Sequence, residues 1–368
     1  MTSKIEKVSM TQVILLLILF RLLTSFAYLP TVNTPPANQD VWIAELISLF
    51  YSFILALPLL FLFHKFKELT IIQCSEKIMG KYIGRLIGLL FIGFMLFQCL
   101  VTLNSATVFL RTAIFPETPE YATAAMIVCT SIYVVFKGIE TIARGAEIFV
   151  PIILVIIIVF ALLGINNMDF SVFLPVLSDS NVKDLNIGAL FSASQSTEII
   201  LFAMFIPYIN DKSRLTKSLS MILTVSVIFL LIITVSTQAT LGDKAAIQAN
   251  YPFFTYTRLI DVFDFIQRIE SINVIAWVIA SIGKFSIYLY FATIGIKQVF
   301  GTKSNKGLIM PLAVVLYILS LTLSIRKSVI LNLLMSYKVF PFIVMPFILV
   351  IPVIMIIVYY FRRKSITV

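Results

Sequence analysis

Long apolar runs separated by short polar segments make up almost the whole chain. A helix that crosses the roughly 30 Å hydrocarbon core of a bilayer needs about 20 predominantly apolar residues. The strict alternation of apolar and polar residues that marks a membrane β-barrel is absent from the sequence. Because lipid offers the backbone no hydrogen-bond partner, helices are the expected spanning element. We predict ten of them, at residues 9–30, 41–63, 83–112, 120–136, 145–165, 188–208, 217–241, 271–300, 308–326 and 338–361.

The composition agrees with an integral membrane protein. Hydrophobic residues make up 60% of the chain and charged residues 12%, whereas soluble domains carry about 45–50% and about 25%. These values exclude a cytosolic enzyme, a disordered chain and a secreted disulfide scaffold. Cys74, Cys99 and Cys129 are scattered singly, and His64 is the only histidine. We therefore expect no metal site and no cofactor.

The basic residues indicate how the chain is oriented in the membrane. Lys and Arg number 28 against 18 Asp and Glu, a net charge of +10. They lie in short segments between the apolar runs, which is typical of membrane topology and not of a nucleic-acid partner. With both termini in the cytoplasm, most basic residues fall on the inner side. The basic segment 327–337 is the exception, because it lies outside in this arrangement.

The predicted helices divide into two repeats of opposite orientation. We predict one transmembrane domain over residues 1–368, with repeats at 9–165 and 188–361. Inverted five-helix repeats are typical of transporters in which the first helix of each repeat is broken and the ligand binds at the breaks. The outer segment 243–270 is long and amphipathic. We predict that it lies across the outer vestibule as a lid, with a pair of helices on the membrane surface as the alternative.

Polar side chains occur where these two breaks are expected. One run lies before Pro30, and the other, which ends at Glu198, is the most polar run inside any predicted span. A single hydroxyl would more simply bond back to its own helix, but a cluster that contains a carboxylate favours a binding site. The candidate ligand-binding residues are Thr24, Ser25, Gln98, Asn104, Gln195, Ser196, Thr197, Glu198, Lys284 and Tyr288.

Three charged residues fall in the middle of predicted spans: Arg21, Glu198 and Lys284. The other acidic residues lie in loops or near span ends. A charge at the bilayer centre costs at least about 2.5–3.5 kcal/mol, so such residues normally face a cavity or one another. Lys284 would take the place of a coupling sodium ion beside the first helix, and Glu198 would bind an amino group of a ligand. Arg21 would either pair with Glu198 or extend towards the cytoplasm, and a purely structural ion network is the alternative for all three.

Four stretches of the chain resemble the GerAB-like proteins, which are the B subunits of spore germinant receptors. They are residues 138–147 (GIETIARGAE), 251–253 (YPF), 264–270 (DFIQRIE) and the run from Lys284 to Tyr290. The resemblance implies the amino acid–polyamine–organocation superfamily and a LeuT-type fold of two inverted five-helix repeats with discontinuous helices 1 and 6. It also implies a protein of the spore inner membrane that senses an amino acid or a sugar together with an A subunit and a C-subunit lipoprotein.

We therefore predict a germinant-sensing receptor subunit rather than an enzyme. The sequence contains no nucleophile elbow, no Ser/His/acid set and no P-loop. A small polar molecule would bind between helices 1, 3, 6 and 8 and shift a conformational equilibrium that the partner subunits detect. A cation- or proton-coupled amino acid permease is the main alternative and a channel is another, because fold does not determine function.

Overall fold

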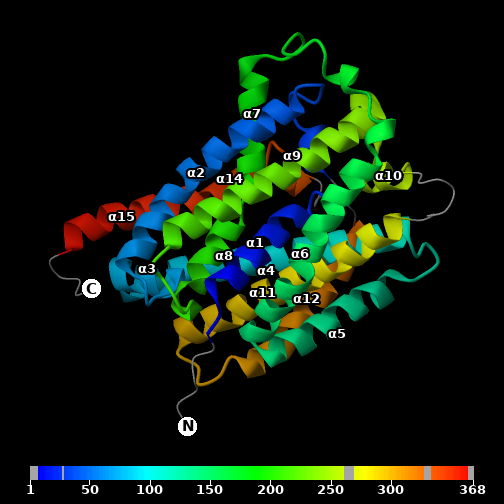
Figure 1. The fold of residues 1–368 in the computed structure, drawn as a ribbon. Coiled ribbons are helices and arrows are strands. Elements are labelled where there is room, and N and C mark those ends of the chain that lie inside the picture. Colours follow the sequence, from blue (N-terminus) through cyan, green and yellow to red (C-terminus); the bar gives the residue numbers. More distant parts are fainter. Residues whose placement is uncertain (1–6, 27–28, 261–268, 327–332, 364–368) are drawn as a thin grey trace.

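The computed structural model describes residues 7–26, 29–260, 269–326 and 333–363, which form a bundle of helices (Figure 1). Eight helices in this part of the chain are long and apolar enough to cross a membrane. Two shorter apolar helices cover Met10–Leu23 and Lys306–Thr322. The all-helical membrane fold is therefore confirmed, while the number of ten spans stays a prediction.

The elements follow one another with these bounds. The long or apolar helices are α1 (Met10–Leu23), α2 (Val41–Lys65), α4 (Lys81–Ala113), α5 (Glu120–Lys137), α6 (Ile139–Leu163), α7 (Val182–Ser194), α8 (Glu198–Phe205), α9 (Leu215–Gln248), α11 (Glu270–Phe300), α12 (Lys306–Arg326), α14 (Phe340–Met345) and α15 (Ile351–Arg362). The short elements are η1 (Pro30–Asn33), α3 (Ile71–Met79), η2 (Ile165–Asn167), η3 (Phe170–Phe173), η4 (Ile206–Tyr208), α10 (Pro252–Arg258) and the π-helical turn η5 (Pro346–Val350).

Two of these helices are interrupted, as the polar runs predict. α1 begins at a capping box in which the Ser9 hydroxyl accepts from the Gln12 N–H and the Gln12 side chain accepts from the Ser9 N–H. It ends at Leu23, and the described residues between Leu23 and η1 are not helical. α7 ends at Ser194 and α8 begins at Glu198. Helices 1 and 6 of the fold are therefore discontinuous.

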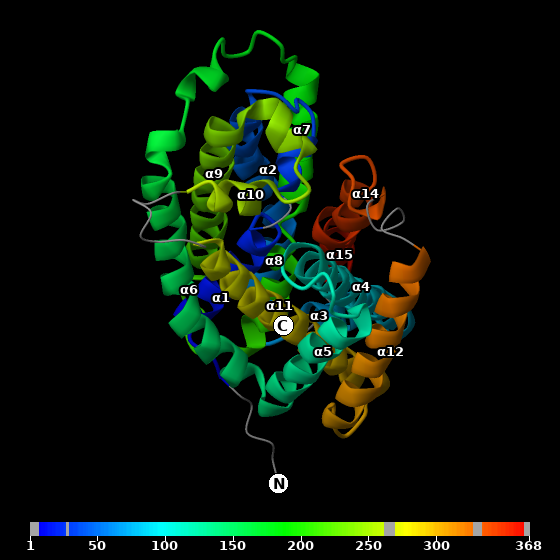
Figure 2. The same cartoon turned by 90° about the vertical axis from the view of Figure 1, so that its right-hand side faces the viewer.

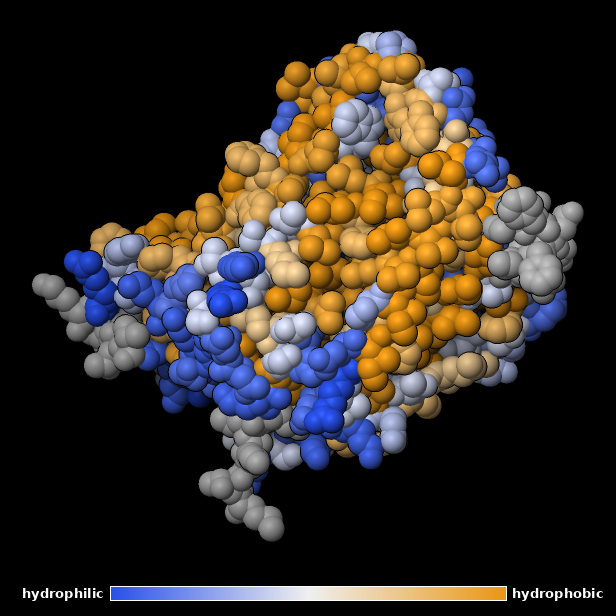
Figure 3. Space-filling view, in the orientation of Figure 1, coloured by the Kyte–Doolittle hydropathy of each residue, from blue (hydrophilic) through white to orange (hydrophobic). Residues whose placement is uncertain are grey.

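The interrupted helices lie in the middle of the bundle. α1 packs against α6, α9 and α11, and α8 packs against α1 and α2. Figures 1 and 2 show both segments surrounded by longer helices. Hydrophobic residues form a broad band across the face in Figure 3, and hydrophilic residues gather at the lower end, near the start of α1. The interruptions are therefore screened from the apolar surface by other helices.

α7 approaches the segment before α2, and the first turn of α2, very closely at Gly188. A Cβ at this position would lie 2.2 Å from the Pro35 carbonyl oxygen and 3.1 Å from the Ala44 Cβ. Because backbone cannot yield as a flexible side chain can, only glycine allows this contact. The close approach fixes the position of Ser192, one turn further along α7.

The ends of several elements differ from the predicted spans. α7 begins at Val182, before the predicted start of this span at residue 188. α9 continues past the predicted end at residue 241, bends at Gly242, where φ is +73°, and ends at Gln248. α10 then follows in the middle of the outer segment 243–270.

Some predictions fall outside the described residues. They are residues 261–268, which belong to the predicted lid and to the stretch 264–270 of the family resemblance, and residues 327–332 of the basic outer segment.

Candidate functional site

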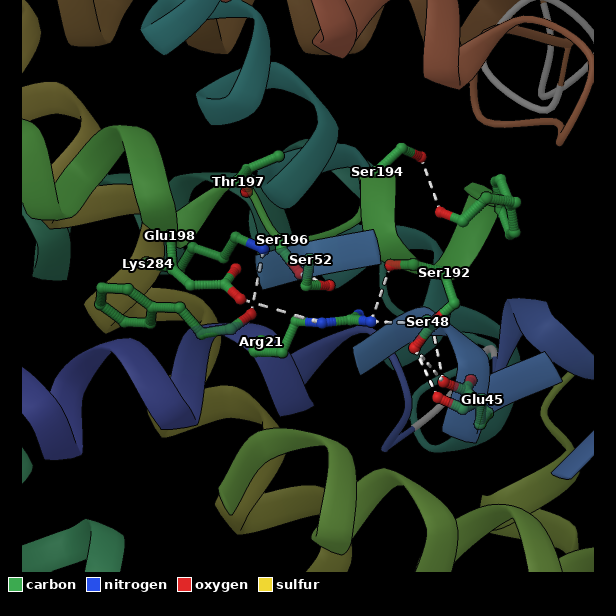
Figure 4. A network of polar contacts seen from close by, with 12 residues as sticks. Arg21, Glu45, Ser48, Ser52, Ser192, Ser194, Ser196, Thr197, Glu198 and Lys284 are labelled. Atoms are coloured by element: carbon green, nitrogen blue, oxygen red, sulfur yellow. Dashed lines mark hydrogen bonds and ion pairs between the residues drawn. The ribbon is translucent and has the colours of Figure 1, made fainter. Parts of the chain in front are cut away.

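The three charges predicted in mid-span meet where the two helices are interrupted (Figure 4). Arg21 lies in the last turn of α1, Glu198 is the first residue of α8, and Lys284 lies in the middle of α11. These three residues are only 5%, 2% and 9% exposed. Arg21 Nε lies 3.9 Å from Glu198 Oε1. Arg21 therefore points into the bundle towards Glu198, and not towards a surface of the bundle.

Arg21 also joins this pair to a second carboxylate. Its Nη2 donates to the Ser192 carbonyl oxygen at 2.8 Å and to the Ser192 hydroxyl at 2.9 Å. The Ser192 hydroxyl in turn donates to Glu45 Oε2 at 2.7 Å. Glu45 lies on α2 and is 1% exposed. The guanidinium group therefore links α1, α7, α8 and, through Ser192, α2.

Glu45 was missed by the sequence analysis, which placed every acidic residue other than Glu198 in loops or near span ends. The sequence does contain a signal that Glu45 is buried, because Glu45 lies inside the apolar run 41–63, after the first four residues of that run. With Glu45 included, this network holds two basic and two acidic side chains, so its formal charges cancel.

Side chains of α11 hold the end of α1. Lys284 Nζ donates to the Phe20 carbonyl oxygen at 3.2 Å. Trp277 Nε1 donates to the Leu23 carbonyl oxygen at 3.1 Å. Asn273 Nδ2 donates to the Phe26 carbonyl oxygen at 3.3 Å. Carbonyls in the last turn of a helix lack partners within the helix, and a cation near them also interacts favourably with the helix dipole. α11 therefore stabilises the interruption. The sequence analysis did not single out Trp277 or Asn273, since an aromatic or an amide at a span end is common.

Hydroxyl groups hold the second interruption. Tyr288 on α11 donates from its hydroxyl to Thr197 Oγ1 at 2.9 Å. The hydroxyls of Ser196 and Ser52 on α2 lie 3.3 Å apart. Predicted site residues Ser196, Thr197 and Tyr288 therefore meet around the start of α8.

The remaining predicted site residues lie at different depths. Ser25 and Gln195 are buried in the two interruptions, and Thr24 is half-buried. Gln98 is buried on α4, next to Cys99, whose thiol lies 3.7 Å from the carbonyl oxygen of Phe285 on α11. This contact places Gln98 near the level of Lys284. Asn104 is half-buried further along α4, and no hydrogen bond between described residues joins it to the interruptions.

Several buried polar atoms near this network lack a hydrogen-bond partner among the described residues. They are Glu198 Oε1, Glu45 Oε1, Gln195 Nε2 and Gln98 Nε2. Buried polar groups in proteins are normally satisfied, and leaving one unpaired costs about 1–3 kcal/mol. The interruptions therefore leave both donors and acceptors available to a polar molecule.

Aromatic side chains pack around Trp277, which binds the end of α1. Phe109 on α4 lies 4.5 Å from Trp277 and 5.3 Å from Phe254 of α10, measured between ring centroids. Tyr256 of α10 donates to the Phe160 carbonyl oxygen at 2.7 Å, and burial raises the pKa of its hydroxyl to about 12. It therefore stays a neutral donor at physiological pH. α10 thus packs against α9 and α11, on the side of Trp277, and a lid function stays a prediction.

An ion pair connects two loops at the opposite side. Lys212 Nζ lies 2.7 Å from Glu68 Oε1, and this hydrogen bond lowers the pKa of the Glu68 carboxyl. Val8, just before α1, pairs with the backbone at the end of η4: its N–H donates to the Tyr208 carbonyl oxygen, and its carbonyl oxygen accepts from the Asn210 N–H. The interruptions are therefore covered by packed elements on both sides.

Comparisons with known proteins agree with this architecture. Residues 7–329 match the family described as spore germination protein. Two relatives from Bacillus subtilis (strain 168) are similar over most of their length. Spore germination protein KB is 26% identical, and the match covers 97% of this chain and 96% of that protein. Spore germination protein YndE is 24% identical, and the match covers 87% of this chain and 88% of that protein.

Two solved transporter structures have a similar fold. MhsT in complex with L-phenylalanine matches with a TM-score of 0.66 and 15% identity over 97% of this chain and 99% of its own. Mhp1, a nucleobase-cation-symport-1 family transporter with bromovinylhydantoin bound, matches with a TM-score of 0.58 and 12% identity. This match covers 91% of this chain and 77% of the Mhp1 chain. The fold is therefore the LeuT-type transporter fold, as the resemblance implies.

Proposed function

Because the chain belongs to the spore germination protein family, we propose that it is the nutrient-sensing subunit of a germinant receptor. It is a multi-pass membrane protein, and its family and fold are those of germination proteins and transporters rather than of catalytic enzymes. In this proposal it lies in the spore inner membrane with both termini in the cytoplasm. It binds a small amino acid or sugar at the interruptions and signals to A and C subunits.

The unpaired buried atoms around the two interruptions support this proposal most strongly. Glu198 Oε1 lies 3.9 Å from Arg21 Nε but accepts no hydrogen bond among the described residues, so it would accept from an ammonium or a hydroxyl group of the ligand. The side-chain amides of Gln195 and Gln98 would donate to its oxygen atoms. An amino acid and a sugar both carry donors and acceptors, and MhsT, which has this fold, was solved with an amino acid.

Pairing these atoms would supply the energy for signalling. Moving a two-state equilibrium from 1:99 to 99:1 takes about 5.5 kcal/mol of differential affinity. Each buried polar group that gains a partner contributes about 1–3 kcal/mol. Four such atoms would together contribute about 4–12 kcal/mol, a range that includes the required 5.5 kcal/mol, when the ligand pairs them in one conformation only.

A deletion strain tests the sensing role. Spores without this chain are expected to lose germination in response to one nutrient of a panel of amino acids and sugars, and the intact gene is expected to restore it. A strain that responds normally to every nutrient would contradict the proposal.

The transporter fold keeps a permease as the second candidate. Proteoliposomes that contain the chain alone separate the two, with the labelled nutrient that the deletion strain no longer detects. Saturable binding without uptake is expected for the receptor. Saturable uptake would favour the permease, and rapid osmotic shrinkage would favour a channel.

Tyr288→Phe is expected to raise the half-maximal nutrient concentration for germination about 2- to 10-fold. The change removes the hydroxyl that donates to Thr197 Oγ1, and one such bond is worth about 0.5–1.5 kcal/mol. Tyr317→Phe is the matched control, because its hydroxyl donates to the Tyr121 carbonyl oxygen at an exposed position. Equal dose–response curves for both variants would show that the Tyr288 hydroxyl does not support the site.

A further inference from the structure

Transporters with broken helices use the ends of those helices to hold the driving cation. Unwound carbonyls and the C-terminal ends of the half-helices coordinate Na⁺ or accept the coupling to H⁺. Mhp1 is by its description a cation symporter of this fold. The two half-helices of this chain whose C-terminal ends face an interruption are α1 and α7.

At the end of α1 three carbonyl oxygens already accept hydrogen bonds from side chains of the protein. The Phe20 oxygen accepts from the Lys284 ammonium, and the Leu23 and Phe26 oxygens accept from the side chains of Trp277 and Asn273. These three donors reach the carbonyls from one neighbouring helix, α11. A cation would have to displace at least the Lys284 ammonium, which carries the same charge.

At the end of α7 a second side-chain cation takes the same position. The Ser192 carbonyl oxygen accepts from Arg21 Nη2 at 2.8 Å and from the Gln195 N–H at 3.1 Å. A carbonyl oxygen has two lone pairs, so this acceptor is fully used. The Ser192 hydroxyl also accepts from Arg21 and donates to Glu45.

The charge of the network also opposes an added cation. Arg21 and Lys284 are formally balanced by Glu45 and Glu198, and all four side chains are at least nine-tenths buried. A bound monovalent ion would leave one uncompensated positive charge in the core, and unpaired buried charge is costly.

We infer that Arg21 and Lys284 are built-in replacements for the coupling cations of this fold, so that the chain assembles its site without a bound sodium ion. The residues present do not fit a cation at either half-helix end. The inference concerns ions alone, and it is tested without the nutrient, so its failure is distinct from failure of the proposed function.

The test measures binding of ²²Na⁺ to the purified full-length chain in nanodiscs. The wild type is expected to show no saturable binding and the same melting temperature in NaCl as in choline chloride of equal ionic strength. Lys284→Ser is expected to bind ²²Na⁺ saturably and to melt higher in NaCl. The substitution frees the Phe20 oxygen, adds a hydroxyl oxygen and leaves the network one positive charge short.

Lys183→Ser is the matched control, since Lys183 is exposed near the start of α7, and it is expected to behave as the wild type. If Lys284→Ser does not accumulate, Arg21→Ser is measured in the same way. Saturable sodium binding to the wild type would overturn the inference. So would a folded Lys284→Ser or Arg21→Ser variant that gains no sodium binding, because the replaced side chain would then not occupy a cation position.

Discussion

Glu198→Gln is expected to abolish germination at nutrient concentrations that saturate the wild-type receptor. Glutamine keeps the shape of the side chain but removes the charge that lies 3.9 Å from Arg21 Nε. Breaking a buried ion pair on one side costs about 3–5 kcal/mol, because the partner is left uncompensated. Since 1.4 kcal/mol is a factor of ten, a cost of this size in the conformation that binds the ligand raises the half-maximal nutrient concentration about 100-fold or more.

A germination dose–response curve measures this effect, and an immunoblot of the spore membrane shows whether the variant accumulates. Glu140→Gln is the control. Its carboxylate pairs with Arg144 at 2.6 Å on the surface, where such pairs contribute about 0–1 kcal/mol. A Glu198→Gln receptor with a wild-type curve would mean that the buried network is only structural.

Gly188→Val is expected to prevent the folded protein from accumulating. A Cβ at residue 188 would lie 2.2 Å from the Pro35 carbonyl oxygen, so α7 would have to move away from the segment that precedes α2. Overpacking a core costs about 1–3 kcal/mol and occasionally more, and here the obstacle is backbone rather than a flexible side chain. The displacement would also separate Ser192 from Glu45, whose hydrogen bond is 2.7 Å long.

Membrane accumulation and the melting temperature of the purified chain measure this prediction. Gly188→Ala should give an intermediate loss. Gly145→Ala is the control, because no atom lies within 4 Å of a Cβ there and alanine favours a helix over glycine by about 0.5–1 kcal/mol. If Gly188→Ala melts at the same temperature as Gly145→Ala, the contact between α7 and α2 does not limit stability.

The network suggests how a ligand at the interruptions would act on distant helices. Arg21 contacts residues of α7 and α8 directly and reaches α2 through Ser192, while Lys284 and Trp277 connect α1 to α11. A ligand that pairs with Glu198 would therefore change the balance of contacts on several helices at once. In our proposal this coupling transmits binding to the partner subunits.

The sequence by itself determined the membrane class, most of the spans and the two interrupted helices. It did so because the bilayer acts on local stretches of chain. A span must be long and apolar, and a charge within it is costly enough to be visible without a structure. For the same reason Arg21, Glu198 and Lys284 were recognisable in advance, although their pairing was not.

Only the tertiary structure decided which groups meet. Hydropathy could not indicate that Glu45 completes the charge balance, or that Gly188 must be glycine. Nor could it show that Trp277 binds the Leu23 carbonyl oxygen, since these residues are 254 positions apart, and Arg21 and Ser192 are 171 apart. An apolar run shows only that a segment is stable in lipid. A hydrogen bond between two helices depends on their packing angle and their relative depth in the bundle, and only the folded bundle fixes these.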